Sequence, residues 1–380
     1  MSDLSVQIAG LPPTPAPPTY RVDWAALDAL YPWIQAMRGV PQDPIFHAEG
    51  DVWTHVGMVC EAMAAMPSWR GLKAEDRAVL FAAALLHDVG KPACTRTDSQ
   101  GTITSLGHSR KGSLMAREIL WRMGAPMLLR ERVASLVAHH MVPFWLIERD
   151  DPDRLAIEVS QSARCDHLAI LAQADARGRV CPDQSRLLEN IALFVATCEE
   201  QSCLRQPRRF ATDHTRFMYF RQPGRQPDVE VYDDTICEVT LMSGLPGAGK
   251  DHWVREHAGG RPIISLDALR DELGVSPRGS QGVVIAEARE RARALLRQGK
   301  SFIWNATNLT ARLRSQPIEL VTAYKARVAI IHIDVPADHI YAQNRERASI
   351  VPENVINRMV RQWEIPQRTE AHWVEWIERA

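Results

Sequence analysis

The stretch "LMSGLPGAGKDHW" (residues 241–253) decides the fold of the C-terminal half of this chain. A short apolar run, "EVTLMS", precedes the glycines, and a helical pattern follows them. In such a turn the backbone amides can face a phosphate, and the helix N-terminus adds its dipole. Gly244, Gly247 and Gly249 supply the turn, while Lys250 brings a positive charge to the terminal phosphates of a nucleotide. The stretch predicts a nucleotide phosphate-binding loop.

Asp251 occupies the place where this loop usually has Ser or Thr, whose hydroxyl ligates Mg²⁺. A bare carboxylate would repel the phosphates, but a divalent cation between them removes the repulsion, because Mg²⁺ accepts carboxylate oxygens readily. One interpretation makes Asp251 a direct or water-mediated Mg²⁺ ligand. The other makes it an acidic residue that complements the dipole of the helix.

Beyond this loop, short apolar runs alternate with helical patterns. "RPIISL", "SFIWNA" and "RVAIIHIDV" have the composition of strands, and amphipathic segments separate them. This alternation predicts a parallel sheet with helices on both faces over residues 236–380.

Polar residues follow the predicted strands at the edge where such sheets bind ligands. Asp267 can accept the proton of an attacking hydroxyl, and Arg270 can hold an acceptor phosphate or that hydroxyl. The alternative for this pair is a helix cap with a surface salt bridge. Asn305, Thr307 and Asn308 reach the same edge, where capping is again the alternative.

Arg345 and Arg347 lie in a charged segment before Pro352. A mobile lid whose arginine closes over the donor phosphates would have this composition. A solvated helix face is the alternative.

The motif order resembles the 5′-OH polynucleotide kinase group of P-loop phosphotransferases over about residues 236–365. The resemblance implies that Lys250 and Arg347, less surely Arg345, hold an ATP or GTP donor with Mg²⁺. It also implies that Asp267 is the general base for a 5′-hydroxyl and that Arg270 contacts the acceptor. Asp251 departs from the pattern of that group and leaves its metal ligation open.

The N-terminal half has a different character. Residues 1–21 are rich in proline, which disfavours helix and central strand, so an extended arm is expected. Apolar residues then recur at helical spacing over residues 22–200, which predicts an all-α bundle. The segment 201–235 has little periodicity and many Arg, Gln and Pro residues, so we expect a linker. The predicted fold is therefore multidomain, α followed by α/β.

Histidines and aspartates gather in the predicted bundle. His87 and Asp88 stand side by side after an apolar helix, and a buried pair of this kind is efficiently satisfied by a divalent metal. The order H…HD…D resembles the HD superfamily of metal-dependent phosphohydrolases over about residues 45–180.

That resemblance implies one metal held by four residues: His55, His87, Asp88 and Asp175. It implies that His108 and His140, with His139 as a further candidate, ligate a second metal or the substrate phosphate, which Lys91 would also contact. Mixed imidazole and carboxylate ligands suit Mn²⁺, Fe²⁺, Ni²⁺ or Zn²⁺ without sharp discrimination.

Composition sets the context for both sites. The net charge of -1 gives no global attraction to nucleic acid, so polynucleotide contacts must come from local patches. The seven cysteines include no C-x-x-C pair, which favours reduced thiols and a cytoplasmic location. We expect no membrane association, because no apolar run is long enough to span a bilayer.

A phosphohydrolase joined to a 5′-OH kinase resembles the bacterial HD-Pnk fusion proteins. The function implied is RNA end healing: phosphorylation of a 5′-OH end and hydrolysis of a 2′,3′-cyclic phosphate or a 2′/3′-phosphate end. RNA or DNA would be the acceptor, and an RNA ligase the functional partner. Two alternatives use the same motifs: a small-molecule kinase fused to a nucleotide phosphohydrolase, and a nucleotide-sensing regulatory module.

Overall fold

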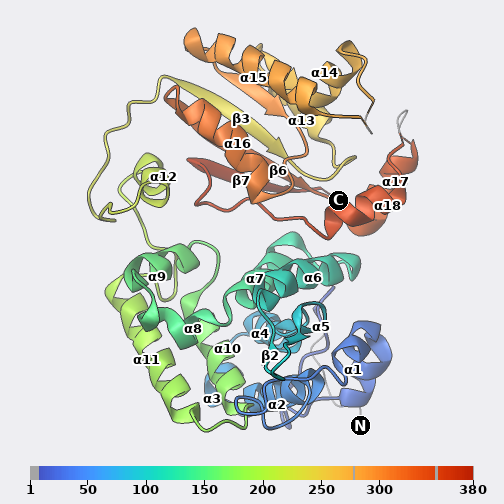
Figure 1. Ribbon diagram of the computed structural model, residues 1–380, viewed down its shortest axis with the longest axis vertical. Coiled ribbons are helices and arrows are strands. Elements are labelled where there is room, and N and C mark those ends of the chain that lie inside the picture. Colours follow the sequence, from blue (N-terminus) through green and yellow to red (C-terminus); the bar gives the residue numbers. More distant parts are fainter. Residues whose placement is uncertain (1–7, 277–278, 347–349, 380) are drawn as a thin grey trace. The chain divides into compact units, whose positions relative to one another are not determined.

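The computed structural model describes residues 8–276, 279–346 and 350–379. It divides into two compact units after Arg208, within the segment predicted to be a linker (Figure 1). Among the described helices, none combines the length and the apolar character needed to cross a membrane.

The first unit is a bundle of helices with one short hairpin, as the helical spacing predicted. Its elements are α1 (Trp24–Leu30), η1 (Pro32–Met37), α2 (Val52–Ala65), α3 (Pro67–Arg70), α4 (Ala74–Leu86), α5 (Lys91–Cys94), β1 (Arg96–Thr97), β2 (Ile103–Thr104), α6 (His108–Arg122), α7 (Met127–His139), α8 (Val142–Trp145), η2 (Leu146–Glu148), α9 (Pro152–Ser160), α10 (Cys165–Arg177) and α11 (Gln184–Glu200).

Helix α4 lies at the centre of this bundle. Glu75 and Asp76 in its first turn complement the helix dipole, and every residue from Ala78 to Leu86 is buried. A helix that is apolar on all sides must be surrounded, and α2, α7 and α10 pack against it. Consequently His87 and Asp88, which follow its last turn, are delivered to the interior of the unit.

The proline-rich segment differs from the free arm that its composition suggested. In its described part, residues 8–21, Leu11 is 1% exposed and belongs to the core of the helical unit. Gly10 has φ +73°, and a Cβ there would lie 2.1 Å from the amide nitrogen of Ala125. The segment contains turns, such as the one in which the amide of Leu11 donates to the carbonyl of Ile8, and it is anchored on the bundle.

The second unit contains a five-stranded parallel sheet in the order β4-β5-β3-β6-β7. Its elements are α12 (Asp213–Arg221), β3 (Cys237–Ser243), α13 (Lys250–His257), β4 (Ile263–Ser265), α14 (Leu266–Glu272), α15 (Gly282–Arg297), β5 (Phe302–Asn305), α16 (Ala311–Thr322), β6 (Ala326–Asp334), α17 (Ala337–Glu346), α18 (Glu353–Val360) and β7 (Trp373–Glu378). The predicted fold class is confirmed, and β7 is an additional edge strand that the sequence did not reveal.

Helix α12 lies inside the segment expected to be a linker. Its Phe217 is 1% exposed and packs in the core of the sheet unit. Arg216 Nη2 donates to the carbonyl of His372, 2.6 Å away, and His372 Nδ1 accepts from the amide of Val328 at 3.0 Å. Because His372 Nδ1 accepts, its Nε2 carries the proton and donates to His214 Nδ1 at 3.0 Å. These contacts make α12 part of the second unit.

Candidate active sites

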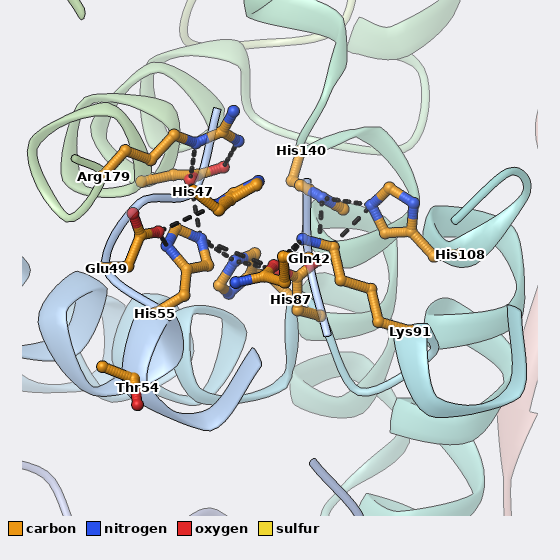
Figure 2. Close-up of polar contacts among 12 residues, drawn as sticks. Gln42, His47, Glu49, Thr54, His55, His87, Lys91, His108, His140 and Arg179 are labelled. Atoms are coloured by element: carbon orange, nitrogen blue, oxygen red, sulfur yellow. Dashed lines mark hydrogen bonds and ion pairs between the residues drawn. The ribbon is translucent and has the colours of Figure 1, made fainter. Parts of the chain in front are cut away.

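Three histidines of the helical unit are held by one local device. In each, Nδ1 donates to the backbone carbonyl three residues earlier, which leaves Nε2 as an unprotonated acceptor in the neutral ring. The pairs are His87 with Ala84 (2.7 Å), His108 with Ser105 (2.8 Å) and His140 with Val137 (2.8 Å). The lone pairs of all three rings are thereby directed to the same region (Figure 2).

His55, in α2, is oriented by a carboxylate. Its Nδ1 lies 2.8 Å from Glu49 Oε1, and that oxygen also accepts from His47 Nδ1 at 2.9 Å. The angle at His55 departs from that of a regular hydrogen bond, but a carboxylate at this distance still favours the proton on Nδ1. The Nε2 atom of His55 therefore also presents a lone pair.

These rings and two aspartates form two adjoining ligand groups. In the first, His55 Nε2 lies 3.4 Å from His87 Nε2 and 3.2 Å from Asp175 Oδ1. The second comprises Asp88, His108 and His140, whose Nε2 atoms are 3.2 Å apart. Asp88 connects the groups, because its Oδ2 is 3.3 Å from His87 Nε2 and its Oδ1 is 3.5 Å from His108 Nε2.

Charged residues surround the carboxylates of this cluster. Arg179 forms a bidentate ion pair with Asp175, in which Nε donates to Oδ1 at 2.8 Å and Nη2 donates to Oδ2 at 2.9 Å. Lys91 Nζ lies 2.7 Å from Asp88 Oδ2 and donates to Gln42 Oε1 at 2.6 Å. These groups fix the orientation of the ligating atoms, as supporting residues do around metal ligands.

The residues fit a bound cation. The Nε2 atoms of these rings approach each other in pairs, at 3.4 and 3.2 Å, inside a buried site that also holds the Asp88 and Asp175 carboxylates. The buried carboxylate of Asp88 is met by Lys91 Nζ and by the imidazole nitrogens of His87 and His108. Two nitrogen ligands of one metal ion lie roughly 3 to 3.5 Å apart when each bond is about 2.1 Å, which matches the spacing of these rings.

Burial and neighbouring charges shift the pKa values of this cluster in different directions. Burial would lower the pKa of His87, but Asp88 and Asp175 raise it. Burial would raise the pKa of Asp88, but Lys91 and His87 outweigh it and hold that pKa well below its usual range. Burial lowers the pKa of His140 to about 3, with His87 and His108 acting in the same direction. Asp88 therefore stays ionised and His140 stays neutral at pH 7, which are the forms that bind metals.

Two further residues of the predicted set lie outside the converging imidazoles. His139 is directed elsewhere: its Nε2 lies 3.1 Å from Ser162 Oγ, outside the groups that converge among the described residues. Lys91 is 7% exposed and paired with Asp88. The sequence reasoning missed Glu49 and Arg179; "HAEGDVWTH", which places Glu49 between two histidines, was the available signal for the first.

In the second unit, the loop between β3 and α13 has the geometry of a phosphate cradle. Gly244, Gly247 and Gly249 have φ of +143°, +86° and +88°, conformations that favour glycine. Lys250 Nζ donates to the carbonyls of Gly244 and Leu245 at 2.9 and 2.8 Å, so its ammonium lies against the loop.

Asp251 has a specific partner that the sequence did not suggest. Its Oδ1 accepts from Asn305 Nδ2 at 2.6 Å, which joins the first turn of α13 to the end of β5. Asp251 is otherwise exposed, and Asn305 is 7% exposed. The pair puts carboxylate and amide oxygens, both suited to Mg²⁺, beside the loop.

Asp267 and Arg270 lie together on α14 after β4. They form an ion pair, and Arg270 Nε also donates to Gln281 Oε1 at 2.8 Å. The helix cap is Ser265, whose hydroxyl accepts from the amide of Ala268 at 3.3 Å, so Asp267 is not needed for capping. The Asp267 side chain is 73% exposed and open to an acceptor.

Asn308 and Asn344 support the edges of this site. Asn308, with φ +44°, donates to the carbonyl of Met242 at 2.8 Å and fixes the loop after β5. Asn344 bonds both the carbonyl and the amide of Val351, at 2.7 and 3.0 Å, and closes the base of the predicted lid. Arg345 is an exposed residue of α17, while Arg347 lies outside the described residues.

Arg379 is a further cation at the loop. Its amide donates to the carbonyl of Asp334 at 2.9 Å, directly after β7. Its Nη1 atom lies 3.0 Å from where a Cβ on Gly249 would be, so the guanidinium lies against the phosphate loop. Sequence reasoning missed it because β7 was not predicted, and an arginine gains this meaning only once its strand is placed next to β6.

Comparisons with known proteins agree with this division. Residues 52–177 match the HD domain family, and residues 239–366 match a family described as AAA domain. The chain thus joins an N-terminal HD domain to a C-terminal P-loop kinase-like domain.

Two similar curated proteins are each named multifunctional CCA protein. That of Halorhodospira halophila is 36% identical over 116 residues, 30% of this chain and 25% of its own length. That of Ralstonia nicotianae is 32% identical over 183 residues, 46% of this chain and 39% of its own length. The match therefore spans well under half of each relative.

Two solved structures of kinases are similar to part of this chain. A putative kinase from Chloroflexus aurantiacus is 18% identical, with a TM-score of 0.32, over 38% of this chain and 86% of that one. A gluconokinase from Sinorhizobium meliloti is 17% identical, with a TM-score of 0.29, over 38% of this chain and 83% of that one. Likeness at this level carries no argument about the reaction.

Proposed function

We propose that this chain heals the ends of broken RNA, with a 5′-OH kinase in the second unit and a phosphoesterase in the first. One observation carries the proposal: a single chain holds two different sites suited to phosphate esters. One is the glycine loop with Lys250, and the other is the imidazole and carboxylate cluster around Asp88.

In the kinase, the donor ATP or GTP would lie with its phosphates in the loop. Lys250 would exchange its two carbonyl acceptors for phosphate oxygens, and Arg379 is placed to add a second cation. Asp251, held by Asn305, would face Mg²⁺. When bound there, Mg²⁺ would offset the negative charge of the phosphates. Arg347 remains a predicted lid residue.

On the acceptor side, Asp267 would take the proton of the 5′-hydroxyl, and Arg270 would orient Asp267 or bind the neighbouring phosphate. The exposure of Asp267 favours a large acceptor, because a small-molecule kinase generally encloses its substrate. This exposure supports a polynucleotide end over a small hydroxylated molecule.

In the phosphoesterase, the two ligand groups would hold one or two ions of Mn²⁺, Fe²⁺, Ni²⁺ or Zn²⁺. Such an ion lowers the pKa of bound water and polarises a phosphoryl oxygen. The chain itself turns Nε2 of His87, His108 and His140 inward through their Nδ1 bonds and fixes Asp175 through Arg179. Lys91 is placed next to Asp88, where it can contact a phosphate.

The substrate proposed for this site is a 2′,3′-cyclic phosphate or a 2′/3′-phosphate end. A 2′,3′-cyclic phosphate can form only where the sugar has a 2′-hydroxyl, so the pairing of this phosphoesterase with a 5′-OH kinase favours RNA as the substrate. DNA is an alternative acceptor for the kinase alone. The products are a 5′-phosphate and a free 3′-hydroxyl, which an RNA ligase can join; such a ligase is the proposed functional partner.

The test is an RNA oligonucleotide with a 5′-OH and a 2′,3′-cyclic phosphate, incubated with the full chain, ATP or GTP, Mg²⁺ and Mn²⁺. Mass spectrometry of both ends should show a new 5′-phosphate and an opened or removed terminal phosphate. Lys250→Ala should abolish only the first change, and Asp88→Ala only the second. Consumption of ATP with neither end altered would refute the RNA proposal and favour a small-molecule acceptor.

A further inference from the structure

Three cysteines meet in the first unit and share no residue with the histidine cluster. Cys165 begins α10, Cys198 lies near the end of α11, and Cys203 follows that helix. Each is 0% exposed, and their sulfur atoms all lie within 4.8 Å of one another. All three are free thiols, so no disulfide accounts for the cluster.

The turn after α11 brings the third cysteine to the other two. Ser202 has φ +51°, a left-handed conformation that is unfavourable for a residue with a side chain. The turn directs the amide of Cys203 to the carbonyl of Cys198, 2.7 Å away, and the carbonyl of Leu204 accepts from the amide of Asp166 at 2.9 Å. The backbone thus folds back on α10 and α11 with the thiol inside.

The cluster is chemically different from an ordinary buried cysteine. Burial raises the pKa of Cys60, which behaves as a small apolar side chain. In the cluster each thiol instead has two other sulfur atoms within 4.8 Å, and a bound cation would let such buried sulfurs lose their protons together.

The geometry and charge suit zinc. Sulfur atoms bound to one tetrahedral Zn²⁺ lie roughly 3.8 Å apart, because each Zn–S bond is about 2.3 Å, so these sulfurs need little movement. Three thiolates around Zn²⁺ leave one negative charge, which the nearby Arg208 can balance. The carbonyl oxygen of Ala156, 3.7 Å from Cys203 Sγ, is available as a fourth ligand. Complete burial favours a structural ion over a reactive thiol, since oxidants cannot reach the sulfurs.

We propose that Cys165, Cys198 and Cys203 bind one structural Zn²⁺ ion. The ion fastens the segment 203–208 to α9 and α10 immediately before the chain enters the second unit. The amide of Arg208 donates to Ser160 Oγ at 3.1 Å, and its carbonyl accepts from Gln161 Nε2 at 3.1 Å, so the segment ends on α9 as well. Zinc would stabilise the boundary of the helical unit independently of either reaction.

Cobalt distinguishes this site from the histidine cluster, because only thiolate ligands give a sulfur-to-Co²⁺ charge-transfer band. The full chain is expressed in zinc-depleted medium supplemented with Co²⁺, so that the ion is present while the chain folds. The wild-type protein should show the band, and Cys198→Ser and Cys203→Ser should lose it. Cys60→Ser, which removes a buried cysteine outside the cluster, should keep it.

Absence of the band from the folded wild-type protein would overturn the proposal, as would its survival in Cys198→Ser. If the serine variants do not fold, X-ray absorption at the zinc edge of the zinc-grown wild-type protein decides the question. A shell of sulfur neighbours at about 2.3 Å supports the site. Nitrogen and oxygen neighbours alone would show that zinc binds only at the histidines.

Discussion

Exchanging Asp251 and Asn305 would test why the phosphate loop carries a carboxylate. P-loop NTPases commonly place a hydroxyl after the lysine and a carboxylate at the end of a strand to hold Mg²⁺. In this chain the residue after Lys250 is the carboxylate Asp251, and the residue at the end of β5 is the amide Asn305. Asn305 Nδ2 donates to Asp251 Oδ1 at 2.6 Å. The site therefore keeps one carboxylate but has it on the other element.

The structure sets the size of the expected effects. Asp251→Asn keeps the side-chain shape but removes the carboxylate charge that would face Mg²⁺. If that contact is worth as much as a hydrogen bond to a charged group, about 1.5–3 kcal/mol, the affinity for Mg²⁺ and nucleotide falls by about 10- to 150-fold. Asn305→Asp brings two carboxylates together, and at about 4 Å their repulsion is about 4 kcal/mol for an effective dielectric constant near 20. The double exchange restores one carboxylate and one amide, so we expect affinity within about tenfold of the wild type.

The assay is equilibrium binding of a fluorescent ATP analogue to the full chain at a series of Mg²⁺ concentrations. Asp271→Asn, which neutralises an exposed carboxylate on α14, is the matched control and should bind as the wild type does. If the losses of binding free energy in the two single variants add in the double variant, to within about 0.5 kcal/mol, Asp251 and Asn305 do not act as a pair, and the proposed role of the carboxylate is refuted. Losses that persist unchanged in EDTA would mean that Asp251 acts only on the helix dipole, an effect of about 0.3–1 kcal/mol.

Four further predictions follow from single contacts. Asp88→Ala leaves the buried Lys91 without its ion pair, so the first unit should lose about 3–5 kcal/mol of unfolding free energy, measured by urea denaturation with Asp88→Asn for comparison. Gly244→Ala should abolish ATP binding in calorimetry, because φ is +143° and the new Cβ would lie 2.6 Å from a carbonyl oxygen of β6. Arg379→Gln should raise KM for ATP about tenfold, whereas Arg379→Lys should retain part of the affinity. Burial lowers the pKa of His372 from 6.5 to about 3, so this histidine is neutral in the folded state at pH values where the unfolded chain already binds a proton. The free energy of unfolding is therefore unaffected above pH 6.5 and falls by about 1.4 kcal/mol per pH unit between pH 6.5 and about 3. His372→Asn should flatten that slope in hydrogen exchange of β7.

The parts of the fold that the sequence predicted have strong local patterns. The loop around Lys250 contains glycines with positive φ, which other residues rarely adopt, and the strands β3, β5 and β6 are largely buried on both faces. Strand β7 was missed because it lies at the edge of the sheet, alternates in burial and includes two glutamates. Helix α12 was missed because its sequence is short, and its buried residues, among them Phe217 and Tyr219, find their partners only once the sheet unit has formed.

The candidate metal site was predictable in its ligands but not in their support. His55, His87, Asp88 and Asp175 were placed by motif order, and the fold brings them together. His139 shares a helix end with His140, and sequence alone cannot decide which of two adjacent rings turns inward. A helix advances about 100° per residue, so only one of the two can face the cluster.

The repeated bond from Nδ1 to the carbonyl three residues earlier explains how separate helices supply equivalent ligands. At the end of a helix the last carbonyls have no intrahelical donor, so a histidine that caps α4 or α7 can bond one of them with its own ring. That single bond fixes the tautomer, stiffens the side chain and aims Nε2 inward. At the start of α6, His108 does the same with the turn before it. The helix ends therefore prepare the ligands before any ion binds, and replacing His140 by Gln would keep a polar group there but lose this preparation.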